Sequence, residues 1–396
     1  MASFSVRFLG CKVSYSDAQE IRERLLRDGH RETADGAEVA VVNACCVTHE
    51  AVRKSRHAAA RAARTHARVF VTGCGANLAR DGFAGLPENV TVVRSRSEET
   101  PDLVADAVGP IGCVQADARI DRVRAFVKVQ DGCSFSCSFC VVPLVRGESR
   151  SRPAAAVLAE IRRRIDQGHR EIVLTGINLG CYRDRAEGHT LARLIREAGS
   201  LPGIARLRLS SIEVNHVSPE LIAAVRETPT VSRHLHVPLQ SGDDTVLRAM
   251  SRRYSADTFL RRVEHADGFN LTSDVIVGFP GEDEAAFEHT LGVVERAGIT
   301  KLHVFPYSPR PGTRTADADT VPPEVKKERG ARLREASRVA CLAHWREKLG
   351  REDVVLVDRP GRGYGDDYSP WLVDGTPGEL VRARARAVSE EGILAA

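Results

Sequence analysis

The first hundred residues alternate between short apolar runs and amphipathic stretches. Runs rich in β-formers cover Phe4–Leu9, Ala37–Asn43 and Ala67–Thr72, and helical periodicity covers Ser16–Asp28 and Val52–Ala63. A cysteine follows each of the three runs at a spacing typical of βαβ units of about 30 residues. Because parallel strands end at one edge of a sheet, we expect an α/β domain whose three strand-end thiols converge.

A second, longer alternation begins near residue 122. The expected strands are Ala125–Val129, Glu171–Thr175, Arg206–Leu209, His234–Val237, Ser273–Val277 and Lys301–Phe305. The expected helices are Pro153–Gln167, Thr190–Ala198, Pro219–Glu227, Ala256–Ala266, Glu284–Arg296 and Pro323–Leu349. Six strand-then-helix units predict a partial (β/α)6 barrel that carries its chemistry on the loops after the strands.

After Leu349 the pattern changes to short alternating runs broken by glycines, which predicts a small β domain of OB-like size. The fold class is therefore α/β with three domains: an N-terminal parallel α/β domain at 1–116, a partial barrel at 117–345 and a small β domain at 346–396. No apolar run reaches the ~20 residues of a membrane span, and the N-terminus lacks a secretory apolar core. We expect a cytoplasmic protein without a membrane partner.

Charge alone says little about partners, because 57 basic and 53 acidic side chains leave a net charge of +4. The ten cysteines say more. In a reducing cytosol their uneven scatter favours metal binding or catalysis over a disulfide framework.

The strongest cysteine signal is the loop Cys133-x3-Cys137-x2-Cys140, directly after the first expected barrel strand. A structural zinc site normally has four protein ligands, so three thiols make zinc the weaker interpretation. A four-iron, four-sulfur cluster held by three thiolates leaves one iron open to a cofactor. We therefore interpret these cysteines as metal ligands with a catalytic role.

This loop, at this place in a partial barrel, resembles the radical S-adenosylmethionine (SAM) superfamily. The resemblance implies that the open iron binds the methionine part of SAM and that Phe139 lies near the adenine. Reductive cleavage of SAM then yields a 5′-deoxyadenosyl radical, which the protein orients and shields from water.

Further motifs resemble the methylthiotransferase family within that superfamily. They cover Val129–Cys133, Pro143–Gly147, Ser149–Pro153, Leu174–Gly180, Leu235–Gly242, Asp274–Glu282 and Phe305–Thr313. The resemblance extends from about residue 5 to about residue 345. The C-terminal segment is similar, more loosely, to that family's small RNA-binding (TRAM-like) β domain.

In that family three N-terminal thiolates hold a second four-iron, four-sulfur cluster, which implies Cys11, Cys45 and Cys74 as its ligands here. Cys45 and Cys46 compete for the middle position, and the family pattern Asn-x-Cys-x-Val-Thr selects Cys45. Buried inert cysteines are the ordinary alternative for any one of them. We interpret Cys113, Cys181 and Cys341 as free thiols without a role, since no ligand-spaced partner accompanies them.

The family's SAM contacts fall at the ends of barrel strands. Carried over to this chain, they are Gly176, Asn178, Ser211, Glu213, Gln240, Asp274 and Gly278. Glycines there allow the backbone to approach a ligand, and polar side chains can bond to ribose hydroxyls or the amino group. Turn glycines and polar strand ends of any barrel are the alternative.

Two basic stretches are candidates for RNA phosphates, because each follows one of the two cysteine sets. The first contains Arg53, Lys54, Arg56, Arg61 and Arg64, and the second contains Arg146, Arg150 and Arg152. A solvated charged face is the ordinary alternative.

Leu9–Val13, Val129–Cys133 and Ser149–Pro153 resemble the tRNA branch of the family, which acts on N6-threonylcarbamoyladenosine at position 37, beside the anticodon. This resemblance implies methylthiolation of adenine C2 with two iron–sulfur clusters, SAM, and an electron donor of the flavodoxin or ferredoxin type, with no DNA partner. Isopentenyl-adenosine tRNA and an aspartate of a ribosomal protein are same-family alternatives. A non-catalytic iron–sulfur RNA-binding protein is the alternative from another class.

Overall fold

The computed structural model describes residues 1–78, 82–109 and 123–395. These residues pack into two compact units. The first comprises Met1–Ile120, Asp131–Ser149 and Ser308–Asp317, and the second comprises Asp121–Gln130, Arg150–Tyr307 and Ala318–Ala396. Cys113 lies outside the described residues. The boundaries at 116 and 345 stay a prediction.

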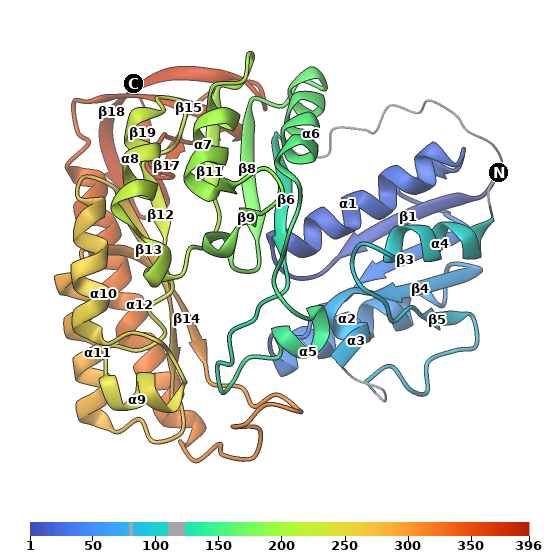
Figure 1. The fold of residues 1–396 in the computed structure, drawn as a ribbon, viewed down its shortest axis with the longest axis horizontal. Coiled ribbons are helices and arrows are strands. Elements are labelled where there is room, and N and C mark those ends of the chain that lie inside the picture. Colours follow the sequence, from blue (N-terminus) through green and yellow to red (C-terminus); the bar gives the residue numbers. More distant parts are fainter. Residues whose placement is uncertain (79–81, 110–122, 396) are drawn as a thin grey trace. The chain divides into compact units, whose positions relative to one another are not determined.

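The first unit contains a five-stranded parallel sheet in the order β2-β1-β3-β4-β5 (Figure 1). Its strands are β1 (Ser3–Phe8), β2 (Arg31–Glu32), β3 (Val39–Asn43), β4 (Arg68–Thr72) and β5 (Val90–Val92). Its helices are α1 (Lys12–Arg27), α2 (His49–Ala62), α3 (Gly73–Leu78), α4 (Thr100–Val108) and α5 (Val142–Arg146). The three strands expected from the sequence are confirmed, whereas α3 was not predicted.

Strand β3 shows why this sheet has two buried faces. Val39 and Val41 pack with α1 and α4 on one face, while Ala40 and Val42 pack with α2 and α3 on the other. Side chains alternate across a strand, so an unbroken apolar run is what a sheet covered on both sides requires. All five β3 side chains are buried.

The second unit contains the barrel strands β6 (Arg124–Asp131), β8 (Glu171–Gly176), β11 (Arg206–Leu209), β12 (His234–His236), β13 (Asn270–Val277) and β14 (Ile299–Pro306). The last residue of β6, Asp131, belongs to the first unit. Neighbouring strands pair in parallel as β11-β8-β6 and as β12-β13-β14. Parallel bridges from Leu207 to Val231 and from Ser211 to His236 join the two groups. The expected six-stranded partial barrel is confirmed.

The helices of this unit are α6 (Ala154–Asp166), α7 (Leu191–Gly199), α8 (Pro219–Glu227), α9 (Asp244–Ala249), α10 (Ala256–Val263), α11 (Glu284–Arg296) and α12 (Pro323–Arg346). The expected helices follow the strands, and the short helix α9 is an additional one that was not predicted. Short strands β7 (Arg150–Ser151), β9 (Arg183–Asp184) and β10 (His189–Thr190) and three single 3₁₀ turns, Leu179–Cys181, Val214–His216 and Glu264–Ala266, complete the unit's loops. No helix in the described part of the chain is both long and apolar enough to cross a membrane.

The C-terminal strands close into a small barrel in the order β15-β16-β17-β19-β18. They are β15 (Glu352–Arg359), β16 (Arg362–Tyr364), β17 (Pro370–Leu372), β18 (Leu380–Ser389) and β19 (Gly392–Ala395). Buried Trp371 and Ile393 fill its core. The predicted β domain is confirmed, although the sequence pattern missed β16, whose glycine looked like a break between runs, and β19, whose residues Gly-Ile-Leu-Ala show no polar alternation.

Candidate functional site

The three strand-end cysteines lie where β1, β3 and β4 end. Cys11 is the N-cap residue of α1, Cys45 follows β3, and Cys74 lies in the first turn of α3. Backbone hydrogen bonds join the three loops. Leu9 donates to Asn43 at 2.9 Å, Ala44 donates to Thr72 at 2.8 Å, and Gly75 donates to Ala44 at 2.9 Å. The parallel sheet therefore brings these loops to one edge.

Two glycines permit the tight turns that carry this site. Gly73 has a φ of 81°, and a Cβ there would lie 2.0 Å from the Asn43 side-chain oxygen. Gly10 has a φ of 137°, and a Cβ there would lie 3.3 Å from Cβ of Cys45. Glycine adopts positive φ more readily than other residues, so β1 and β4 turn toward the middle loop at little conformational cost.

Cys45 is held from α2. Its backbone N–H donates to Ser55 Oγ at 3.0 Å, and Ser55 donates in turn to Ala51 O at 2.8 Å. Burial raises the pKa of Cys45, and the charges of Cys74 and Cys11 raise it further. Cys11 and Cys74 therefore lie near enough to Cys45 for their charges to act on it.

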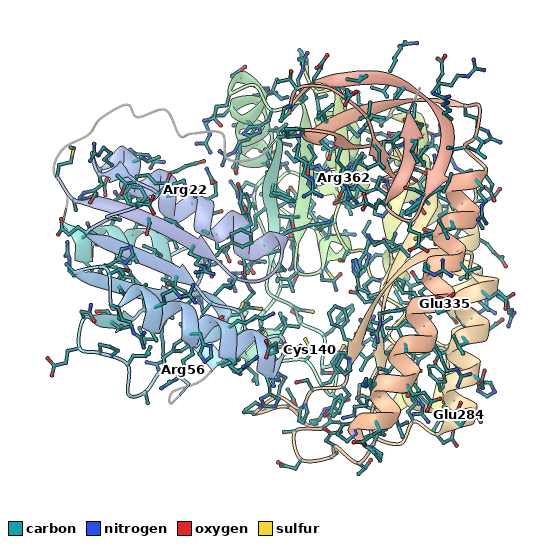
Figure 2. All side chains as sticks on the ribbon, turned by 180° about the vertical axis from the view of Figure 1, so that it is seen from behind. Arg22, Arg56, Cys140, Glu284, Glu335 and Arg362 are labelled. Carbon is teal, nitrogen blue, oxygen red and sulfur yellow. The ribbon has the colours of Figure 1, made fainter. Side chains whose placement is uncertain are left out.

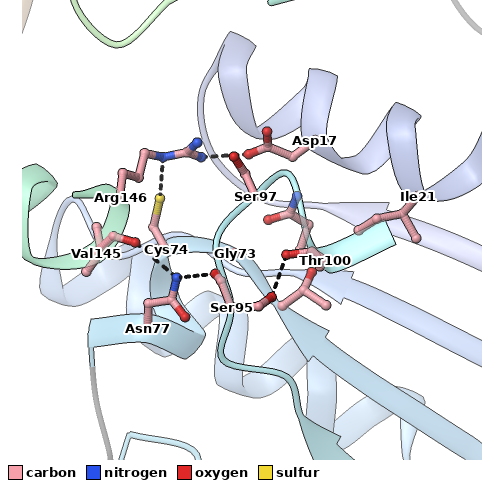
Figure 3. Close-up of a pocket in the computed structure, with 12 residues that line it drawn as sticks. Asp17, Ile21, Gly73, Cys74, Asn77, Ser95, Ser97, Thr100, Val145 and Arg146 are labelled. Atoms are coloured by element: carbon pink, nitrogen blue, oxygen red, sulfur yellow. Dashed lines mark hydrogen bonds and ion pairs between the residues drawn. The ribbon is translucent and has the colours of Figure 1, made fainter. Parts of the chain in front are cut away.

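Cys74 has side-chain hydrogen bonds with Cys46 and Arg146. The Cys46 thiol donates a hydrogen bond to it and lowers the pKa of Cys74 to about 7; burial opposes this effect, and the positive charge of Arg146 adds to it. Arg146 Nε lies 3.0 Å from Cys74 Sγ (Figure 3). Cys46 is therefore in contact with the site, while the choice of Cys45 as ligand stays a prediction.

Arg146 is buried, with only 4% of its side chain exposed. Its guanidinium bonds to Asp17 at 2.7 Å and to Asp131 at 3.0 Å, besides Cys74. This position corrects our expectation of an RNA contact, because the charge is already neutralised inside the first unit. Asp17 gave no signal in the sequence, and Asp131, although it lies in the Val129–Cys133 motif, was assigned no role.

A small cavity of ≈ 20 Å³ borders Cys74 and Arg146 (Figure 3). Asn43 Oδ1 and Thr72 Oγ1 line it and have no hydrogen-bond partner among the described residues. A cavity of this size holds about one water molecule.

The second cysteine set forms the loop after β6. Gly132 has a φ of 68°, and a Cβ there would lie 2.0 Å from Glu148 O, so only glycine fits this turn. Cys133 N donates to Gly147 O at 3.0 Å, and Cys140 N donates to Cys137 O at 3.2 Å. These bonds fold the loop back on itself, and all three cysteines are partly exposed.

Residues of the segment 308–317 also hold this loop. Thr315 donates from N and from Oγ1 to Ser138 O, at 3.2 and 3.1 Å. The neighbouring Phe139 is half-buried, and Cys140 is labelled in Figure 2. Phe135 N lies 3.5 Å from Cys133 Sγ, and such N–H donors to sulfur are characteristic of iron–sulfur ligands. The donor set fits a cluster with three thiolates.

The expected SAM contacts lie along the carboxyl ends of the barrel strands. At β8, Asn178 N donates to Gln130 Oε1 at 2.8 Å, and the buried Asn178 Oδ1 has no partner in the described structure. Gln240 has a φ of 66° and donates from N to Asp274 O at 2.8 Å. Gly176 abuts Gln130, where an added Cβ would lie 2.9 Å from Oε1.

Other residues of that set already have protein partners. Glu213 pairs with Arg252 at 3.4 Å, and Asp274 pairs with two histidines described below. Gly278 N donates to Glu282 Oε1 at 2.8 Å, and a Cβ there would lie 2.3 Å from the Lys326 side chain. Packing against α12 therefore explains Gly278 without a ligand. Ser211 forms a β-bridge to His236.

The basic helix α2 presents both paired and exposed charges. Arg53 and Lys54 pair with Glu50, and Arg56 donates to the carbonyls of Gly82 and Ala84 (Arg56 is labelled in Figure 2). Arg61 and Arg64 are exposed.

In the second unit, Arg152 bonds to Glu160 and Lys128 O, while Arg150 is half-buried.

Sequence reasoning missed one basic surface. Arg382, Arg384 and Arg386 are exposed on β18, and Ala383 and Ala385 between them are buried. The Arg-Ala-Arg-Ala-Arg alternation was the available signal, because period-two patterning puts all three cations on the outer face of a strand.

Comparison with known proteins agrees with this architecture. Residues 127–294 match the model of the Radical SAM superfamily, and residues 3–94 match Uncharacterized protein family UPF0004. The chain is 34% identical to the threonylcarbamoyladenosine tRNA methylthiotransferase MtaB of Chlamydia pneumoniae, over 99% of this chain and 97% of the relative. It is 35% identical to the tRNA-2-methylthio-N(6)-dimethylallyladenosine synthase of Sorangium cellulosum, over 92% and 84%.

Among solved structures, the radical SAM methyltransferase TsrM of Kitasatospora setae aligns with a TM-score of 0.58 at 14% identity, covering 80% of this chain and 77% of that one. That likeness concerns the fold alone. The fold and the three-cysteine loop define a radical SAM enzyme. The chain belongs to the methylthiotransferase family of that superfamily. Membership implies one four-iron, four-sulfur cluster and SAM as cofactors.

Proposed function

We propose that this chain is a tRNA methylthiotransferase that adds a methylthio group to C2 of N6-threonylcarbamoyladenosine at position 37. The observation that carries the proposal is similarity over almost the whole chain to a relative of that name. This similarity extends over the three-cysteine loop, the N-terminal sheet and the C-terminal barrel.

The roles of the chain's own residues follow from their placement. Cys133, Cys137 and Cys140 would hold the first cluster, and the family resemblance assigns Phe139 to the adenine of SAM. When bound, the cluster and SAM would supply the radical that activates the C2–H bond of the tRNA adenine. Asn178 and Gln240 orient the cofactor from the strand ends, where the buried Asn178 oxygen is ready to accept a hydrogen bond.

Cys11, Cys45 and Cys74 hold a second four-iron, four-sulfur cluster in this proposal. Support comes from the three joined strand-end loops and from the effect of the Cys74 and Cys11 charges on the pKa of Cys45. Arg146 directs positive charge and a donor at Cys74, which favours the thiolate form that a cluster requires. An electron donor of the flavodoxin or ferredoxin type reduces the enzyme.

The tRNA backbone binds to exposed cations, for which Arg61 and Arg64 on α2 and the β18 arginines are suitable. Phosphate contacts of this kind give position without sequence information. Changing Arg382, Arg384 and Arg386 together to Ala should reduce the salt dependence of tRNA binding by about one unit of slope for each lost phosphate contact. An unchanged slope would exclude this face of the C-terminal barrel.

The deciding experiment supplies the anaerobically reconstituted enzyme with SAM, reductant and sulfide, and with tRNA bearing threonylcarbamoyladenosine. Nucleoside mass spectrometry should detect the 2-methylthio derivative. A parallel reaction uses isopentenyl-adenosine tRNA, the substrate type suggested by the Sorangium relative. Product from the second tRNA alone would replace the proposed substrate. Absence of 5′-deoxyadenosine in both reactions would instead favour a non-catalytic iron–sulfur protein.

A further inference from the structure

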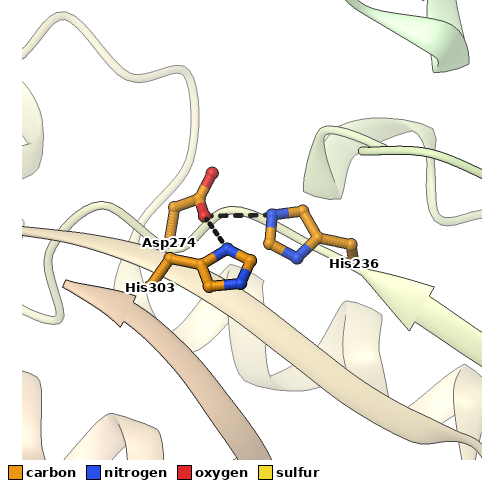
Figure 4. Close-up of side chains that lie close together, drawn as sticks. All are labelled: His236, Asp274 and His303. Carbon is orange, nitrogen blue, oxygen red and sulfur yellow. Dashed lines mark hydrogen bonds and ion pairs between the residues drawn. The ribbon is translucent and has the colours of Figure 1, made fainter. Parts of the chain in front are cut away.

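Three adjacent barrel strands place two imidazoles and one carboxylate together. His236 ends β12, Asp274 lies within β13, and His303 lies within β14. Asp274 Oδ1 is 3.1 Å from His236 Nε2 and 3.1 Å from His303 Nδ1 (Figure 4). Both rings point a nitrogen at the same oxygen, and their centroids are 5.4 Å apart.

The spacing of these atoms suits a metal ion. Zinc binds histidine nitrogen and carboxylate oxygen at about 2.0–2.2 Å, so two ligands of a tetrahedral site lie roughly 3.3 Å apart. One ligand atom from each of the three side chains falls within 4.8 Å of the other two.

His236 has a hydrogen bond on its second ring nitrogen, as histidine ligands of metals usually have. Its other ring nitrogen, Nδ1, lies 2.9 Å from Thr272 Oγ1, which also lies 3.0 Å from His234 Nε2. A hydrogen bond on the far nitrogen fixes ring orientation and tautomer in metal sites. Burial raises the pKa of Asp274, but hydrogen bonds from His236 and His303 outweigh it and hold that pKa well below its usual range.

The exposed fraction of the side chain increases from His236 through Asp274 to His303, so the cluster is open to solvent on the His303 side. The side chain of His236 is 9% exposed, that of Asp274 is 24% exposed, and that of His303 is 52% exposed. Three protein ligands and solvent access on one side leave room for a fourth ligand, such as water or a substrate oxygen.

We propose that His236, Asp274 and His303 bind one divalent transition-metal ion, of the zinc or ferrous type that two imidazoles and a carboxylate select. The site is separate from the cysteine sites and does not rest on the tRNA substrate. When both imidazoles are in the neutral form that binds metals, the carboxylate gives the cluster a net charge of −1, which favours a cation.

The test adds zinc chloride to the reconstituted full-length enzyme without tRNA or SAM. Metal analysis after desalting should give one zinc per chain at unchanged iron content. His303→Ala, at an exposed position, should weaken zinc binding at least about tenfold, and Thr272→Val should weaken it roughly tenfold through the lost support of His236. X-ray absorption at the zinc edge should show nitrogen and oxygen ligands only.

A second acid–histidine group supplies the matched control. Asp184, Glu187 and His189 also lie close together, but Asp184 accepts backbone N–H groups of Ala154 and Ala186, and His189 bonds to Glu197 at 3.0 Å. His189→Ala should leave zinc binding unchanged. Equal zinc binding by the wild type and His303→Ala, loss of zinc only in His189→Ala, or sulfur ligands in the absorption spectrum would each overturn the proposal.

Discussion

Cys133, Cys137 and Cys140 share one loop, whereas Cys11, Cys45 and Cys74 come from three strand ends spread over the first 74 residues. The loop is closed by local bonds such as Cys140 N to Cys137 O. The strand-end set exists only after β1, β3 and β4 have paired. A local motif can therefore be read from spacing, but the second site depends on the folded sheet and on what packs against it.

The largest effect should come from Cys137→Ala. Loss of one of three ligands removes the cluster at the loop, so production of 5′-deoxyadenosine from SAM should fall to background. Liquid chromatography of anaerobic reactions measures this directly. Ser136→Ala, in the same loop but without a ligand atom, is the control and should retain SAM cleavage.

Cys45→Ala should separate the two sites. We expect it to keep SAM cleavage at the loop while making no methylthio product, because the proposed second cluster loses a ligand. Product at the normal rate would remove Cys45 from the ligand set. In that event Cys46→Ala becomes the informative variant, since the Cys46 thiol contacts Cys74.

Arg146→Gln should destabilise the cluster-free protein by about 3–5 kcal/mol, because Asp17 and Asp131 would be left as buried, unpaired charges. Urea unfolding measures the difference. Arg53→Gln is the matched control, since Arg53 pairs with Glu50 on the exposed face of α2, and its midpoint should not move. Equal midpoints for both variants would contradict the interior role of Arg146.

The protonation of Cys74 gives a smaller, sharper test of the strand-end site. In the cluster-free protein, the pH midpoint for its alkylation by iodoacetamide should lie near its pKa of about 7, because the thiolate predominates above that pH. Arg146→Gln should raise the midpoint by removing positive charge. Site-resolved mass spectrometry separates Cys74 from Cys45, whose burial raises its pKa.

The smallest effect concerns α2 beside the strand-end site. Changing Arg61 and Arg64 to Ala should lower tRNA affinity modestly and reduce the salt slope by about one to two. Filter binding across salt concentrations measures the slope. Arg56→Ala is a useful contrast, because Arg56 donates to two backbone carbonyls and should affect stability more than binding.

Much of the molecule followed from sequence patterns. Period-two and helical periodicities located the sheet strands and the six barrel units, since burial on one or two faces leaves a direct mark on residue order. The strands β16 and β19 and the helix α3 left no such mark, because each contains glycine and none shows a clear apolar–polar alternation. Cysteine spacing and resemblance to the family together selected the six candidate ligands.

Tertiary packing decided the environment of each charge. Arg146 looked like the other arginines of its basic run, yet it lies buried between Asp17, Asp131 and Cys74. The sequence marked Asp274 as a strand-end cofactor contact, and the structure places it against two histidines from neighbouring strands. Residue order specifies which elements form, but pairing between distant elements sets solvation and partners, and these determine what a charged side chain can do.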